Sequence, residues 1–320
     1  MSNDKALWEN DVSIKRDNRE KIITKKVKDF YEKIQFPGRR PMEQDSLIFY
    51  RKFSKLIDSE ASKENPIRVL DAGCGTGNTS IALSMQFEKV YFTGIDISAA
   101  SILRAQQTAK ERNLNNVQFY EWDLLASLDH EEKYNIILCF GVLHHTAHMQ
   151  KVLKNLCSSL KRDGTIFLWV YGEYGRYRHS LNLQLLSMLL NSPPKYDNPI
   201  DLAREFILKT GNSMVINDLL GVRKDDLMLK DFYTDSTWIA DQFLNPNELT
   251  LNIKQLLLLT KNANLKITEW IGVKKDASSW FSSPELKERF NNLSEEEQMI
   301  ALDLLLKPDR YFLTLKNYKG

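Results

Sequence analysis

Residues 69–78 read Val-Leu-Asp-Ala-Gly-Cys-Gly-Thr-Gly-Asn, and the rest of the chain can be interpreted around them. The residues just before them, 66–70, are rich in branched apolar side chains and predict a short buried strand. The residues just after them, 79–83, open an apolar-periodic run that predicts a helix. A glycine-rich turn between a parallel strand and a helix places bare backbone at the carboxyl edge of a sheet, where doubly wound folds bind their ligands. The three glycines would let such a ligand approach the main chain closely.

Acidic residues around this loop narrow the kind of ligand. A second predicted strand, residues 90–95, is followed by Asp96, nineteen residues after Gly77. An acid about 20 residues beyond the glycines can accept hydrogen bonds from ribose hydroxyls. A dinucleotide fingerprint would read G-x-G-x-x-G, whereas this loop reads D-A-G-C-G-T-G with Asp71 in front of the glycines. An acid suits a cationic ligand better than a diphosphate, which it would repel.

Residues 69–78, followed by Gly-Ile-Asp-Ile-Ser at 94–98, resemble the first two motifs of class I S-adenosylmethionine-dependent methyltransferases. The resemblance implies that the cofactor is S-adenosyl-L-methionine and that the product is S-adenosyl-L-homocysteine. It further implies that the glycine loop and Asp71 lie against the methionine part of the cofactor. Asp96 would hold the ribose hydroxyls, and Asp123 would accept a hydrogen bond from the adenine amino group.

The resemblance is specific over residues 67–171, weak over 246–315 and absent for most of 172–240. Trp122 could stack on the adenine ring or simply pack in the core. The residues expected to contact the cofactor are Asp71, Gly73, Cys74, Gly75, Thr76, Gly77, Asp96, Ile97, Trp122, Asp123, Phe140 and Gly141.

The composition indicates an ordinary globular protein. The 320 residues are 42% apolar and 27% charged, which fits one large domain or one domain with an insertion. The net charge of +2 gives no reason to expect a nucleic acid or an anionic membrane as partner. Three cysteines within predicted elements indicate reduced thiols, and we find neither a signal peptide nor an apolar run of membrane-spanning length. We therefore expect a soluble cytoplasmic protein, with its oligomeric state left open.

Strands and helices alternate regularly from residue 66 onward. Strands are predicted at 67–72, 90–95, 117–121, 134–140 and 165–171, and helices between them at 78–86, 99–113 and 149–160. This alternation predicts an α/β fold with a Rossmann-like, doubly wound, mostly parallel sheet. Later strand-like runs at 265–271 and 310–315 bring the sheet to seven strands, and the resemblance implies that the last one is antiparallel. A helical excursion at 276–308 is expected to begin at Ser283-Pro284-Glu285.

The chain is expected to have four parts. Residues 1–60 form an N-terminal helical lid, with a loose segment at 1–15 and helices at 16–34 and 45–59. Residues 61–171 form the Rossmann-like cofactor-binding core. Residues 172–245 are too long for a loop and predict a helical cap insertion, with helices at 181–190, 201–208 and 213–220. Residues 246–320 complete the core sheet, beginning with a helix at 246–264.

Methyl transfer from a sulfonium is an in-line displacement that depends mainly on positioning and desolvation. A general base is needed only when the accepting atom must lose a proton. His144 and His145, in the H-H-x-x-H run at 144–148, could be structural, could act as base or substrate contact, or could bind a metal. No nearby Asp, Glu or Cys completes a ligand set, so no metal is expected.

The segment that leaves the fifth strand offers further candidates. Tyr171 and Tyr174 could also act as bases, and Arg176 could hold a carboxylate or phosphate of the substrate beside Tyr177. The alternative is that this aromatic and basic loop only packs against the cap helices. Tyr31, in the lid, is a further candidate for substrate contact or for plain packing. Another aromatic cluster, at 231–238, ends the cap.

The sequence therefore predicts a metal-independent methyltransferase that moves a methyl group to an O, N or C atom of a small or medium-sized metabolite. A cap in place of a basic groove favours an enclosed substrate over a polymer. The N/D-P-P-Y/F pattern of amino-directed adenine, cytosine and glutamine methyltransferases is absent after residue 140. The alternatives are methylation of a protein or carrier-bound substrate, and a non-catalytic protein that binds S-adenosylmethionine. The non-catalytic alternative is disfavoured, because a site without activity has no physical need for the three glycines, Asp96 and Asp123 together.

Overall fold

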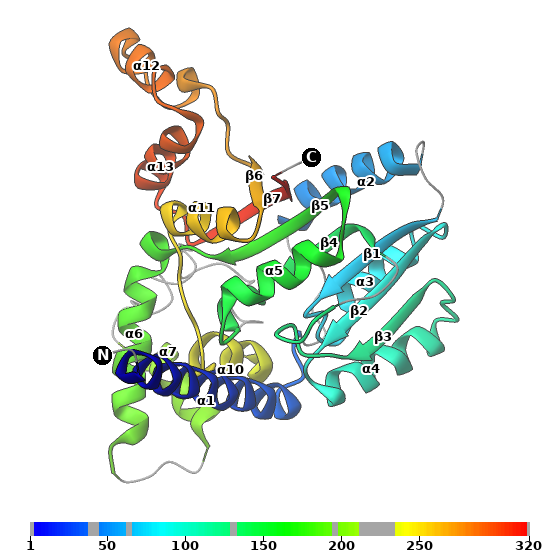
Figure 1. The fold of residues 1–320 in the computed structure, drawn as a ribbon. Coiled ribbons are helices and arrows are strands. Elements are labelled where there is room, and N and C mark those ends of the chain that lie inside the picture. Colours follow the sequence, from blue (N-terminus) through cyan, green and yellow to red (C-terminus); the bar gives the residue numbers. More distant parts are fainter. Residues whose placement is uncertain are drawn as a thin grey trace.

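The computed structural model describes residues 3–37, 45–61, 66–128, 133–193, 198–210 and 234–318. At its centre is a seven-stranded sheet in the order β3-β2-β1-β4-β5-β7-β6 (Figure 1). Five strands are parallel: β1 (Ile67–Ala72), β2 (Val90–Asp96), β3 (Val117–Glu121), β4 (Tyr134–Phe140) and β5 (Leu160–Tyr171). β7 (Arg310–Asn317) runs antiparallel to both β5 and β6 (Leu265–Trp270). The predicted Rossmann-like sheet with an antiparallel last strand is confirmed.

Helices cover both faces of the sheet. One face packs against α2 (Asp45–Ala61), α3 (Asn78–Ser84) and α4 (Ala99–Glu111) around a core that includes Phe53 and Phe92. The other face packs against α5 (Met149–Ser159) and α11 (Ile253–Asn262). Because β1 and β4 are covered on both faces, nearly all their residues are buried, which explains their continuous apolar runs. The strand order reverses between β1 and β4, so this edge is the switch point where such folds bind ligands.

A third apolar cluster lies outside the sheet. It joins α6 (Glu173–Asn191), α7 (Pro199–Lys209) and α10 (Ser236–Leu244) through side chains such as Leu186, Phe206 and Trp238. The long helix α1 (Asn3–Lys33) runs beside α10 in Figure 1. The predicted helix at 213–220 and residues 231–233 of the aromatic cluster lie outside the described residues. The division of the chain into four parts stays a prediction.

Several predicted boundaries differ from the structure. α1 begins at Asn3 rather than at residue 16, since no Gly or Pro interrupts residues 3–33. β5 begins at Leu160 rather than at residue 165, and the β4–β5 register shifts between the pairs Tyr134–Leu160 and Ile136–Thr165.

The region around residues 236–264 also differs from the prediction. α10 was not predicted, and the helix expected over 246–264 begins only at Ile253. It starts there because Asn252 and Gln255 form a reciprocal capping box. The excursion near the end was predicted correctly: α12 (Pro284–Asn291) starts after Ser283, and α13 (Glu295–Leu306) follows. No helix in the described ranges is long and apolar enough to cross a membrane.

Candidate active site

The loop that follows β1 has a backbone that requires glycine. Gly73, Gly75 and Gly77 have φ angles of 78°, 53° and 78°, which side-chain-bearing residues rarely adopt. A Cβ atom on Gly73 would lie 2.3 Å from a methyl group of Val142, and one on Gly75 would lie 2.1 Å from the carbonyl oxygen of Phe36. The loop is therefore enclosed between the segment after β4 and the end of the N-terminal helix.

Every backbone N–H group of residues 73–77 has an acceptor within the protein. The first two donate to the Ile95 carbonyl at 2.8 and 3.0 Å, and the next donates to Oδ2 of Asp96 at 2.9 Å. The last two donate to the carbonyls of Phe36 at 3.2 Å and Cys74 at 2.9 Å. Loops that bind phosphate keep N–H groups free for the ligand. This loop does not, which argues against a dinucleotide at this site.

Two carboxyl groups lie at the ends of the adjacent strands β1 and β2. Asp71 is buried and accepts a 2.6 Å hydrogen bond from the Ser80 hydroxyl. Burial raises the pKa of Asp71 to about 6, and the nearby Asp96 adds to this effect. Asp96 also accepts a hydrogen bond from the Ser98 amide at 2.9 Å, and burial raises its pKa above the usual value. Two acids at one sheet edge favour a cationic or hydroxyl-bearing ligand.

The next expected contacts follow β3. Trp122 donates its amide to the carbonyl of Asp96 at 2.8 Å, and the Asp123 carboxylate accepts from the Leu125 amide at 2.9 Å. Ile97 is partly exposed beside these residues. They lie at the carboxyl edge of β2 and β3, where an adenosine moiety was expected.

The end of β4 completes the row of strand ends. Phe140 packs edge-on against Phe312 with ring centroids 5.5 Å apart, and Gly141 has a φ of 71°.

Cys74 is buried, which raises the pKa of its thiol well above the usual value. Cys74 is therefore an uncharged thiol at neutral pH and acts as a small packing residue.

The end of α1 is joined to the glycine loop and to α4. The Thr76 hydroxyl donates to the carbonyl of Pro37 at 2.9 Å, and the Ser98 hydroxyl donates to the carbonyl of Tyr31 at 3.2 Å. The Glu32 carboxylate accepts the amide of Ala99 at 2.7 Å, at the first turn of α4. The sequence analysis did not single out Glu32, because its partner lies 67 residues away along the chain.

A second group of side chains lies beside the glycine loop. It contacts the loop region through Val142, which packs against Gly73 just before the short helix η1 (Leu143–His145). We call it the polar cluster, and it consists of Tyr31, His144, His145, Tyr171, Arg176, His179, Asp241, Gln242, Asn245, Asn247 and Glu248.

The two histidines of η1 have different surroundings. Nδ1 of His145 lies 2.8 Å from the carbonyl oxygen of Asn247, which can only accept, so Nδ1 carries the hydrogen. Nε2 of His145 then keeps its lone pair, and no described residue is hydrogen-bonded to it. His144 is fully buried against the Tyr171 ring, with centroids 4.0 Å apart. Burial lowers the pKa of His144 well below the usual value, and it stays neutral.

Arg176 is the centre of the ionic contacts in the polar cluster. Its guanidinium lies 3.5 Å from the Tyr171 ring centroid, and Nη2 is 2.8 Å from Oε1 of Glu248. Nη1 donates to Oε1 of Gln242 at 3.3 Å, and Nε2 of Gln242 donates to the Tyr171 hydroxyl at 2.6 Å. Burial raises the pKa of Tyr171, so this hydroxyl stays protonated at neutral pH.

Tyr31 links the N-terminal helix to this cluster. Its hydroxyl donates to Oδ1 of Asp241 at 2.8 Å and accepts from Nδ2 of Asn245 at 2.8 Å. Burial raises the pKa of Tyr31 well above the usual value. Asp241 was not expected at the site, although a carboxylate between the apolar residues of α10 was a signal that could have found it.

The structure does not bring all candidates together. Tyr174 and Tyr177 lie on the outer side of α6, and 61% of Tyr177 is exposed. His148 caps α5 by accepting the amide of Lys151 at 3.2 Å, so it does not share a helical face with His144. Among the described residues, no group of three or more His, Cys, Asp or Glu side chains could hold a metal ion.

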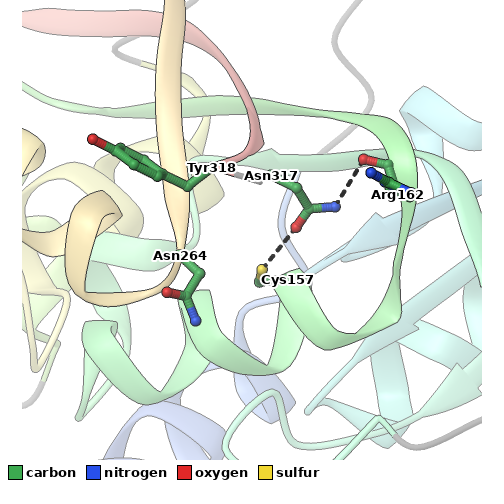
Figure 2. A pocket seen from close by; sticks show the side chains of 5 residues that line it. All are labelled: Cys157, Arg162, Asn264, Asn317 and Tyr318. Carbon is green, nitrogen blue, oxygen red and sulfur yellow. Dashed lines mark hydrogen bonds between the residues drawn. The ribbon is translucent and has the colours of Figure 1, made fainter. Parts of the chain in front are cut away.

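Figure 2 shows an open pocket in another part of the molecule, lined by Cys157, Arg162, Asn264, Asn317 and Tyr318. The thiol of Cys157 donates to Oδ1 of Asn317 at 3.1 Å, and Nδ2 of Asn317 donates to the carbonyl of Arg162 at 3.2 Å. These residues lie near the starts of β5 and β6 and at the end of β7. The pocket is therefore at the edge of the sheet opposite to the glycine loop.

Comparison with known proteins agrees with this geometry. Residues 63–173 match a family model described as a methyltransferase domain. This chain contains a class I S-adenosylmethionine-dependent methyltransferase domain. The match includes β1 to β5 and the glycine loop, together with His144, His145 and Tyr171.

Relatives of this chain resemble it over different lengths. An uncharacterised protein of Synechococcus sp. is 26% identical over 74% of this chain and 57% of its own length. The malonyl-[acyl-carrier protein] O-methyltransferase of Bacillus anthracis is 32% identical over 37% of this chain and 42% of its own length. The chain thus spans about half the length of these curated relatives. PKMT2 from Rickettsia typhi, solved in complex with AdoHcy, shares the fold at a TM-score of 0.62, with 17% identity over 80% of this chain and 49% of PKMT2.

Proposed function

We propose that this protein transfers the methyl group of S-adenosyl-L-methionine to a small or medium-sized metabolite. The observation that carries the proposal is the glycine loop, whose N–H groups are all used internally while the carboxyl groups of Asp71 and Asp96 lie beside it. A methyl donor with a cationic amino acid part and a ribose needs acids and close backbone approach, not free N–H groups for phosphate. The AdoHcy complex of PKMT2, which has the same fold, supports the same cofactor class.

The residues present fit this cofactor. Asp71 and the glycine loop would hold its methionine part, Asp96 its ribose, and Asp123 with Trp122 its adenine. When bound, the cofactor supplies a methyl group on a positively charged sulfur, which is already an activated leaving group. The protein's own part is then to place the acceptor, to exclude water and to take up a proton where the acceptor carries one.

His145 is the candidate general base. Its Nδ1–H is fixed by the Asn247 carbonyl, so the free Nε2 lone pair is available for a proton. His144 is a weaker base because burial lowers its pKa, and Tyr171 is held neutral. These differences follow from contacts that the sequence alone did not distinguish.

Acceptor-dependent methylation is the direct test of this function. The full chain is incubated with S-adenosyl-L-methionine and fractionated metabolite extract, and S-adenosyl-L-homocysteine release is measured together with the mass gain of one methyl group. We expect one low-molecular-mass fraction to show both. A gain confined to the protein fraction would contradict the metabolite assignment, and no release with any fraction would contradict the activity.

The pKa of Asp71 makes cofactor affinity depend on pH. With a pKa of about 6 in the free protein, this carboxyl is mostly protonated at pH 5 and mostly ionised at pH 7. If the cationic amino group of the cofactor binds the carboxylate, affinity for S-adenosyl-L-homocysteine should rise about tenfold between these pH values. Calorimetry at a series of pH values measures this change. Asp71→Asn should bind more weakly at pH 7 and show a flat profile, whereas an unchanged profile would contradict the role of Asp71.

The raised pKa of Asp71 also makes the free energy of unfolding depend on pH. Because the folded-state pKa of Asp71 is raised, protonation favours the folded state. This contribution is fully present below the unfolded pKa of 3.8 and is lost as the pH rises through about 6. Urea titrations of the free protein and of Asp71→Asn between these pH values should therefore diverge as the pH rises, with the variant the more stable near neutrality.

A further inference from the structure

Five buried polar atoms of the polar cluster have no hydrogen-bond partner in the part of the chain that the structure describes. They are both ring nitrogens of His144, Nε of Arg176, Nδ1 of His179 and Oε2 of Glu248. The three ring and guanidinium side chains are at most 3% exposed. Buried polar groups are nearly always hydrogen-bonded, and each exception needs an explanation. Five such exceptions within one cluster of contacting side chains require a common explanation.

These atoms belong to one connected network. The His144 ring and the Arg176 guanidinium both pack on Tyr171, with distances of 4.0 and 3.5 Å to its ring centroid. Nε2 of His179 is 3.0 Å from the carbonyl oxygen of Gln242, and Glu248 joins through its ion pair with Arg176. The network lies beside the glycine loop and includes the segment that carries His145.

Acceptors outnumber donors among the unpartnered atoms. Nε2 of His179 faces a carbonyl and so carries the hydrogen, which leaves Nδ1 as an acceptor. Burial lowers the pKa of His179 to about 3 and that of His144 well below the usual value, so both rings are neutral. His144 therefore offers one donor and one acceptor. The unpartnered acceptors are therefore three: one nitrogen of His144, Nδ1 of His179 and Oε2 of Glu248. The unpartnered donors are two: the other nitrogen of His144 and Nε of Arg176.

The charged side chains of the network give it a net negative charge. Arg176 is the positive group, and its charge is matched by Glu248 at 2.8 Å. Asp241 adds a second carboxylate, which accepts hydrogen bonds from the Tyr31 hydroxyl at 2.8 Å and from Gln242 at 2.9 Å. One positive and two negative groups give a net charge of −1. A buried site of this kind disfavours an anionic ligand and favours a cationic donor.

We propose that the polar cluster is the acceptor site of the methyltransferase and that it takes a primary alkylamine, bound as its ammonium. This inference rests on the proposed function. The three N–H groups of an ammonium equal the three unpartnered acceptors in number, and the two remaining donors require an uncharged oxygen elsewhere on the same molecule. One proton passes from the ammonium nitrogen to Nε2 of His145 and then to solvent. The freed lone pair forms the nitrogen–carbon bond to the donated methyl group while the carbon–sulfur bond breaks and sulfur keeps its electron pair.

Three four-carbon probes test the charge preference. The full chain, saturated with S-adenosyl-L-homocysteine, is titrated with n-butylammonium, n-butanol and butyrate, and binding is followed by NMR. We expect n-butylammonium to bind at least about tenfold more tightly than butyrate. Equal or tighter binding of butyrate or n-butanol would overturn the proposal, as would the absence of binding by all three probes.

Two variants connect this preference to the cluster. Glu248→Gln removes one negative charge and should weaken n-butylammonium binding about tenfold while affinity for S-adenosyl-L-homocysteine is retained. His144→Phe keeps a ring against Tyr171 but removes two unpartnered nitrogens. It should weaken n-butylammonium binding and, in the absence of ligand, raise the melting temperature, because unsatisfied buried atoms are lost. His144→Phe keeps the test decisive if Glu248→Gln does not fold.

The matched control is Glu285→Gln on α12, whose carboxylate is exposed and pairs with Arg289 on the same helix. It should bind n-butylammonium as the unmodified protein does. Undiminished binding by both cluster variants would overturn the proposal. If n-butylammonium binds as expected but S-adenosyl-L-homocysteine does not bind at all, the proposed function fails while the amine site stands.

Discussion

Replacing Asp96 by asparagine is expected to weaken the binding of S-adenosyl-L-homocysteine about 100-fold. In the proposed site this carboxylate accepts hydrogen bonds from the ribose, and charge-assisted bonds of this kind contribute about 1.5–3 kcal/mol each. A loss of about 2.7 kcal/mol corresponds to the expected factor. Asparagine would also place a donor where a carboxylate oxygen now accepts a hydrogen bond from the amide of Gly75 or of Ser98, each at 2.9 Å. Calorimetry with the folded variant measures the loss.

Glu121 provides a matched control for this substitution. It lies opposite Asp96 in the β2–β3 register, but its side chain is 47% exposed and pairs with Lys28. Glu121→Gln removes a carboxylate from the same edge of the sheet without touching the glycine loop. It should change the dissociation constant less than about threefold. Wild-type affinity in Asp96→Asn would remove Asp96 from the cofactor site.

Replacing Arg176 by methionine is expected to destabilise the fold by about 3–5 kcal/mol. The substitution leaves the Glu248 carboxylate buried without its cation, and an isolated buried charge is strongly unfavourable. The guanidinium contact with the Tyr171 ring is lost as well. Urea unfolding followed by circular dichroism measures the change in the free energy of unfolding.

A double-mutant cycle separates the ion pair from packing. Arg176→Met combined with Glu248→Leu removes both charges and should recover most of the lost stability, because an apolar pair of similar volume replaces the buried ions. Arg289→Met on α12 is the control, since it breaks an exposed pair with Glu285 and should cost less than about 1 kcal/mol. If Arg176→Met and Arg289→Met lowered the free energy of unfolding equally, the buried ion pair would contribute no more to stability than the exposed pair.

The bounds of three strands that lead into the proposed cofactor site could be predicted from the sequence. β1, β3 and β4 begin and end at the predicted residues, because β1 and β4 are mostly apolar runs followed by a glycine and β3 alternates apolar and polar residues. The helix boundaries after residue 245 were harder to predict from the sequence. The start of α11 depends on Asn252 and Gln255, whereas Pro246 had suggested an earlier start.

The polar cluster could not be assembled from the sequence. Tyr31 and Asp241 are 210 residues apart in the chain, and Arg176 and Glu248 are 72 apart, so no local spacing relates them. Helical geometry also separates neighbours, because Arg176 lies inside while Tyr177 lies outside. The residue types were visible in the sequence, but their pairing depends on how α1, α6 and α10 pack.

We propose that the glycine loop holds S-adenosyl-L-methionine and not a dinucleotide. Calorimetric titration of the full chain with S-adenosyl-L-homocysteine and, separately, with NAD tests it most directly. We expect saturable binding of S-adenosyl-L-homocysteine that Asp96→Asn weakens, and no binding of NAD at the same concentrations. Tight binding of NAD without binding of S-adenosyl-L-homocysteine would contradict it.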